Sequence, residues 1–69
     1  MTITYFKDTD TLLVTFNSNK VEETKDISEN VIVDMDADKN IVSMTVEHAT
    51  YTATISNFAF NQVSDKKAA

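Results

Sequence analysis

The residues best suited to chemistry are three aspartates at alternate positions, Asp34, Asp36 and Asp38. Carboxylates spaced in this way begin a calcium-binding loop, so these three are the candidate ligands for calcium or another small ligand. The remaining pattern is missing, because Lys39 stands where the loop needs glycine and Thr45 where it needs a bidentate glutamate. The alternative, which we favour, is a β-hairpin turn whose Asp and Asn side chains bond their own backbone. We therefore predict no cofactor.

The single histidine, His48, is the other candidate for chemistry. An enzyme would use it with Glu47 or Asp34, but the chain has no cysteine to serve as its nucleophile. A domain of this size also leaves little room for a water-excluding pocket of about 300 Å³ or more. We predict that the protein is not an enzyme and that no residue is catalytic.

The densest negative patch consists of four carboxylates, those of Glu22, Glu23, Asp26 and Glu29. In a functional interpretation this patch docks a basic partner protein. In a structural one it is a solvated edge strand, whose charges discourage pairing with other chains. We favour the structural interpretation and keep the four residues as a candidate partner patch.

The elements that position these residues are indicated by their composition. Glycine and proline are absent, so turns are marked by clusters of Asn, Asp and Ser, between segments rich in β-branched and aromatic residues. This pattern predicts a mainly β fold, bordering on α+β: an antiparallel β-meander of four to five strands at residues 2–6, 11–16, 20–25, 30–35 and 41–48. The polar segment at 20–25 reads as an edge strand or a connection. Alternation of period two places the apolar residues on one face.

The C-terminal segment is predicted to cover that face. Residues 51–55 are typical of a strand, whereas Ile55, Phe58, Ala59 and Val63 have helical spacing. We favour a short helix at 56–63, and a strand stays open because Phe58 and Phe60 also alternate. Residues 1–63 then form a single domain, and residues 64–69 a disordered tail. Phe6 and Phe60 are the aromatic side chains that we expect to be exposed.

Chain length and charge limit the partners. A chain of 69 residues buries only about 60% of the surface that it exposes when unfolded. Without cysteine it has no disulfide, so self-association, most simply as a dimer, is the expected source of further burial. A formal charge of −5 and the absence of arginine predict no binding to nucleic acid or to a membrane surface. The N-terminus lacks the features of a signal peptide, so we expect a cytoplasmic protein.

Parts of the chain also resemble a known family, the domain of unknown function 2283 family of small bacterial, archaeal and cyanobacterial proteins. The similar features are Tyr5 with the segment 8–12, then the segments 21–24, 30–36 and 38–42, in that order, within about residues 3–49. The chain departs from the family where Lys39 or Asn40, and then Ser43, replace glycines. The resemblance implies a small β-rich fold and brings no established activity. Some relatives are encoded beside toxin-like proteins, which raises an antitoxin-like role as a hypothesis.

These observations lead to one functional prediction and two alternatives. We predict a non-enzymatic protein–protein interaction module that self-associates. The first alternative is an antitoxin-like neutraliser of a basic partner. The second is a binder of calcium or a small ligand at the turn formed by Asp34, Asp36 and Asp38.

Overall fold

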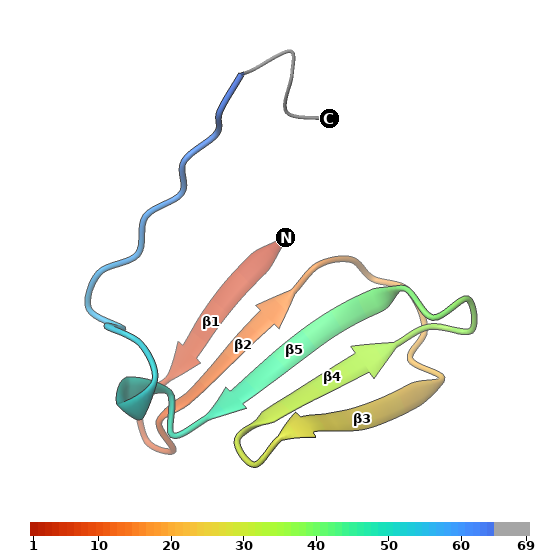
Figure 1. The fold of residues 1–69 in the computed structure, drawn as a ribbon, viewed down its shortest axis with the longest axis horizontal. Helices are drawn as coiled ribbons and strands as arrows, with labels where there is room; N and C mark the ends of the chain where they lie inside the picture. Colours follow the sequence, from red (N-terminus) through yellow and green to blue (C-terminus); the bar gives the residue numbers. More distant parts are fainter. Residues whose placement is uncertain (65–69) are drawn as a thin grey trace.

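The computed structural model describes residues 1–64, which form one five-stranded antiparallel sheet (Figure 1). The strands are β1 (Thr2–Phe6), β2 (Thr11–Thr15), β3 (Glu23–Ser28), β4 (Val31–Met35) and β5 (Ile41–Glu47), and the 3₁₀ helix η1 (Ala49–Tyr51) follows β5. The predicted mainly β fold class is confirmed. The third strand begins three residues later than predicted, and residues 20–22 belong to the connection before it.

The strand order differs from the predicted simple meander. It is β1-β2-β5-β4-β3, so β5 lies between β2 and β4. Strands β3, β4 and β5 do form a meander, and β2 lies beside its last strand, which is a Greek-key arrangement. The polar connection after β2 runs along the end of the sheet, where the side-chain amide of Asn17 donates to Ile41 O at 3.1 Å and that of Asn19 to Asp36 Oδ2 at 3.0 Å. The prediction was wrong here because it assumed that consecutive strands are neighbours.

The register gives the sheet two different faces, because residues paired across antiparallel strands share a face. One face is apolar, as predicted, and includes Ile3, Tyr5, Leu12, Val14, Val31, Val33, Met44 and Val46. The opposite face, called the polar face here, is rich in hydroxyl groups, although Phe6, Leu13 and Ile32 also lie on it. One row of it crosses all five strands as Thr2, Thr15, Ser43, Asp34 and Thr24.

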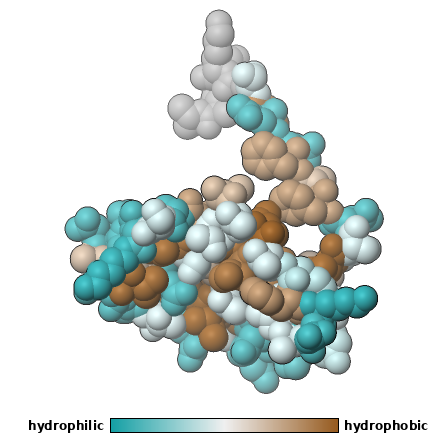
Figure 2. Space-filling model, turned by 180° about the vertical axis from the view of Figure 1, so that it is seen from behind, coloured by the Kyte–Doolittle hydropathy of each residue, from teal (hydrophilic) through white to brown (hydrophobic). Residues whose placement is uncertain are grey.

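The buried core of the described part of the chain is small. The buried apolar residues are Val33, Val42 and Ala49, and no large side chain of residues 1–64 is fully buried. A sheet with one apolar face is normally closed by a second layer of structure. Here the space-filling view leaves brown, hydrophobic surface visible between polar residues over the sheet (Figure 2). The sheet is therefore a single layer whose apolar face stays partly exposed.

The predicted C-terminal helix or strand is absent. Beyond η1, residues 52–64 contain neither a helix nor a strand, and the segment runs away from η1 as an extended chain (Figure 1). Its Ser, Thr and Asn side chains compete for backbone hydrogen bonds, which disfavours a helix. Of the predicted disordered tail, Ser64 has no regular structure and residues 65–69 lie outside the described part.

None of the helical structure within residues 1–64 is long and apolar enough to cross a membrane.

Candidate functional site

A cluster of exposed apolar side chains lies beside the start of β1. Met1, Ile3, Phe58 and Phe60 line a hollow of about 560 Å³. Their exposed fractions are 72%, 37%, 68% and 67% respectively. Single apolar residues are common on protein surfaces, but several gathered at one place mark an interaction site. We call these four residues the β1 apolar cluster.

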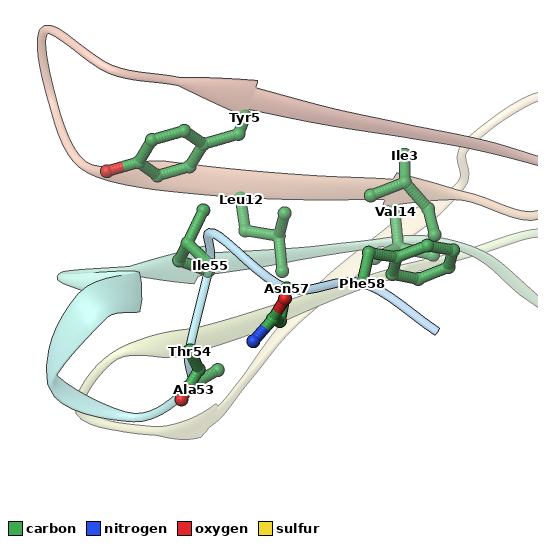
Figure 3. A pocket seen from close by; sticks show the side chains of 9 residues that line it. All are labelled: Ile3, Tyr5, Leu12, Val14, Ala53, Thr54, Ile55, Asn57 and Phe58. Carbon is green, nitrogen blue, oxygen red and sulfur yellow. The ribbon is translucent and has the colours of Figure 1, made fainter. Parts of the chain in front are cut away.

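A second hollow separates the C-terminal segment from the sheet. It measures about 230 Å³ and lies between the apolar residues of β1 and β2 and the segment that carries Ile55 and Phe58. Figure 3 shows the ring of Phe58 beside Ile3 and Val14, and Ile55 on the side of Leu12. The segment thus runs beside the open side of β1 (Figure 1), and the hollow separates it from the apolar side chains of β1 and β2.

Asp10 determines where the C-terminal segment begins. Its carboxylate accepts hydrogen bonds from Tyr5 Oη at 2.6 Å and from Thr50 Oγ1 at 2.7 Å, and its carbonyl accepts the N–H of Ala49 at 2.9 Å. Asp10 itself is left-handed, with φ of 54°. These bonds join the β1–β2 turn to η1, so the chain leaves the sheet beside β1 (Figure 1).

The same bonds change the acidity of both partners. The hydroxyl of Tyr5, and after it that of Thr50, lowers the pKa of Asp10, because these bonds stabilise the carboxylate. The bond to Asp10 raises the pKa of Tyr5, because it favours the neutral phenol. At neutral pH a neutral phenol therefore donates to a carboxylate, and this pair links β1 to the turn that follows it. This bond had no signal in the sequence beyond the place of Tyr5 and the turn after it in the family resemblance.

The three candidate calcium ligands are not brought together. Asp34 accepts hydrogen bonds from Thr24 Oγ1 and Ser43 Oγ, each at 2.7 Å, on the polar face of the sheet. Asp36 lies in the β4–β5 turn, and the side chain of Asp38 is exposed. In the part of the chain that the structure describes, no three His, Cys, Asp or Glu residues are grouped as metal ligands.

The β4–β5 turn instead agrees with the favoured interpretation of a self-bonded hairpin turn. Asp36 Oδ1 accepts the backbone N–H groups of Asp38 and Asn40, each at 2.9 Å. These bonds, that of Asn40 first, lower the pKa of Asp36. The left-handed residue of the turn is Lys39, with φ of 67°. Lys39 occupies one of the two positions at which the family resemblance implies a glycine.

The other candidates lie apart from the β1 apolar cluster. His48 is exposed and left-handed, and its ring stacks on that of Tyr51 at 5.7 Å. In the acidic patch, Glu22 and Glu23 form ion pairs with Lys20 and Lys39. The register places Glu23 on the apolar face and Asp26 on the polar one, and Glu29 lies in the β3–β4 turn. The four carboxylates of this patch therefore do not share one face.

These features define a small protein made of one antiparallel sheet, with an apolar cluster at one edge. A sequence model of a family of proteins of unknown function, DUF2283, matches residues 2–49. The match covers more than half of the chain, so the chain belongs to this family, as the resemblance predicted. It contains all five strands and ends at Ala49, so Phe58 and Phe60 lie outside it. No curated protein and no solved structure matches the chain.

Proposed function

We propose that this protein is a non-enzymatic protein–protein interaction module that self-associates. The observation that carries the proposal is the β1 apolar cluster, in which four side chains from two segments are exposed around one hollow. Burial of exposed apolar area stabilises an association by about 25 cal/mol per Å² before the costs of association. Because the core is small, the same burial would also stabilise the fold itself.

The polar residues support a role without catalysis. Asp10, Asp34 and Asp36 each accept hydrogen bonds from neighbouring hydroxyl, amide or backbone groups. His48 stacks on Tyr51 at the surface. These hydrogen bonds hold the carboxylates in place within the sheet and its turns, which is a structural role.

The antitoxin-like alternative stays a prediction that draws on the formal charge of −5. A basic partner that docks on the acidic patch would need its carboxylates on one surface. Glu23 and Asp26 lie on opposite faces of β3, so we favour association through apolar contacts over this alternative.

Native mass tests self-association directly. The purified chain, without added N-terminal residues, is measured by light scattering and by thermal melting over a wide range of concentrations. We expect a multiple of the 7.7 kDa chain mass and a melting temperature that rises with concentration, because association stabilises the folded state by mass action. A mass of one chain and a constant melting temperature throughout would contradict the proposal.

A further inference from the structure

β1 is an edge strand with no strand on its open side, where only the irregular segment after η1 runs past it (Figure 1). It lies at one end of the strand order and pairs only with β2. Its residues, TITYF, include no charge, and its pairing with β2 is regular from end to end. An exposed, uncharged, regular edge is a template for pairing with another strand, because its outward N–H and C=O groups have no partner in the sheet.

We infer that β1 pairs antiparallel with β1 of a second copy of this chain, so that two sheets join into one of ten strands. This inference rests on the proposed self-association and names the surface that performs it. A two-fold axis perpendicular to the sheet produces this pairing and makes the contact self-complementary. The contact closes on itself, because each copy uses its single β1.

Symmetry and the length of β1 fix the register. A perpendicular two-fold axis must pass midway between a residue and its own copy, because directly opposed residues of antiparallel strands share a face. Centring it on Thr4 pairs all five residues of the strand with the second copy, whereas any other centre leaves strand residues outside the pairing. Thr4 then faces Thr4 of the second copy, and Ile3 faces its Tyr5. The apolar faces of the two copies lie on the same side of the joined sheet.

This register also gives the β1 apolar cluster an occupant. Ile3 lines the hollow together with Met1, Phe58 and Phe60. Tyr5 of the second copy lies opposite Ile3 in the paired strands, and therefore beside this hollow. By symmetry, Tyr5 of the first copy lies beside the hollow of the second copy. Its hydroxyl still donates to Asp10 of its own chain. Strand pairing and apolar burial thus occur at one contact.

Charge substitution at Thr4 tests the contact. Thr4 lies on the polar face, so a charge there leaves the apolar face untouched. Thr4→Lys and Thr4→Glu each place two like charges opposite one another on the two-fold axis, which we expect to weaken the dimer more than about tenfold. Mixing the two variants pairs opposite charges and restores the dimer. Thr24→Lys puts the same substitution on the same face of the other edge strand, and we expect it to leave the dimer unchanged.

Sedimentation equilibrium measures the mass of each sample, and circular dichroism shows whether it is folded. If one Thr4 variant fails to fold, the other one and its comparison with Thr24→Lys carry the test. A wild-type dimer that persists in folded Thr4→Lys and Thr4→Glu overturns the β1 contact and leaves self-association to another surface. Equal loss of the dimer in Thr24→Lys also overturns it. A monomeric wild type overturns the proposed function as well, and leaves β1 free for a strand of another protein.

Discussion

The two edges of the sheet differ in charge and in the regularity of their pairing. β3 carries Glu23, Lys25 and Asp26, and its pairing with β4 has an irregularity between Asp26 and Ser28. β1 carries neither a charge nor an irregularity. Charges and bulges prevent an edge from adding strands. The difference teaches that this chain blocks one edge and leaves one open, a combination that permits a closed dimer and prevents an open-ended fibre.

The largest expected effect comes from removing the protection of β3. Replacing Glu23, Lys25 and Asp26 together by threonine removes every charge of β3, so we expect assembly no longer to stop at two copies. We expect species much larger than a dimer, with loss of protein from solution, in sedimentation velocity. The matched control exchanges the same three residues for Asp, Arg and Glu, which keeps the charges. If the threonine variant keeps the wild-type mass, β3 is not blocked by its charges and the comparison fails.

A smaller effect is expected from the aromatic side chains beside β1. Phe58→Ala or Phe60→Ala removes apolar area that the proposed dimer would bury, worth about 1.5–3 kcal/mol for a fully buried phenylalanine. Each change should weaken the dimer by roughly tenfold or more, measured as the dissociation constant. Val63→Ala serves as the control, because Val63 is exposed and does not line the hollow. Equal dissociation constants for all four chains would show that the cluster takes no part in association.

Acid should act on stability through Asp10 and Asp36. The folded-state pKa of each is lowered, so their stabilisation is complete above the unfolded value of about 3.9 and is lost as the pH falls through the folded value. Melting temperatures should therefore drop at acid pH. Tyr5→Phe removes the bond that lowers the pKa of Asp10 most, and should reduce the size of this drop. An unchanged pH profile in Tyr5→Phe would mean that the bond from Tyr5 to Asp10 adds nothing to the acid dependence of stability.

The smallest effect is expected at Lys39, far from the β1 contact in the strand order. A left-handed conformation costs a non-glycine residue about 1–2 kcal/mol, and glycine avoids this cost. Glycine also has more conformational freedom in the unfolded chain, which cancels part of the gain in stability. Lys39→Gly should thus raise the unfolding free energy by about 0.5–1 kcal/mol in urea titration, with the dissociation constant of the dimer unchanged. A destabilised variant would show that the ion pair with Glu23 matters more than the backbone.

The sequence predicted the local features of this molecule better than the long-range ones. Alternation of Val31 and Val33, and of Met44 and Val46, gave the strands and their apolar face, because side-chain direction alternates strictly along a strand. The position of β5 beside β2 depends on contacts between distant segments, for which local pattern carries no signal. The prediction of a helix at 56–63 was wrong. The spacing of Phe58 relative to the other apolar residues fits a helix and an extended chain equally well, so it did not decide between them.

The candidate site was predicted only in fragments. Phe6 and Phe60 were expected to be exposed, and both are, but only Phe60 belongs to the β1 apolar cluster. The other members, Met1, Ile3 and Phe58, were not recognised, because a cluster formed by the first and last described segments has no signature in either one. The carboxylates attracted attention through their spacing, but Thr24 and Ser43, the hydroxyl partners of Asp34, come from other strands.

Hydrogen exchange in the unmodified chain tests the comparison of the edges most directly. Amides of β1 and β3 are followed residue by residue, in samples diluted from high to low protein concentration. Only alternate amides of an edge strand are bonded within its own sheet, so we predict that the remaining amides of Thr2–Phe6 are protected at high concentration and lose protection on dilution, while β3 is unaffected. Outward amides of β1 that exchange freely at every concentration, or concentration-dependent protection of β3 instead, would contradict the account.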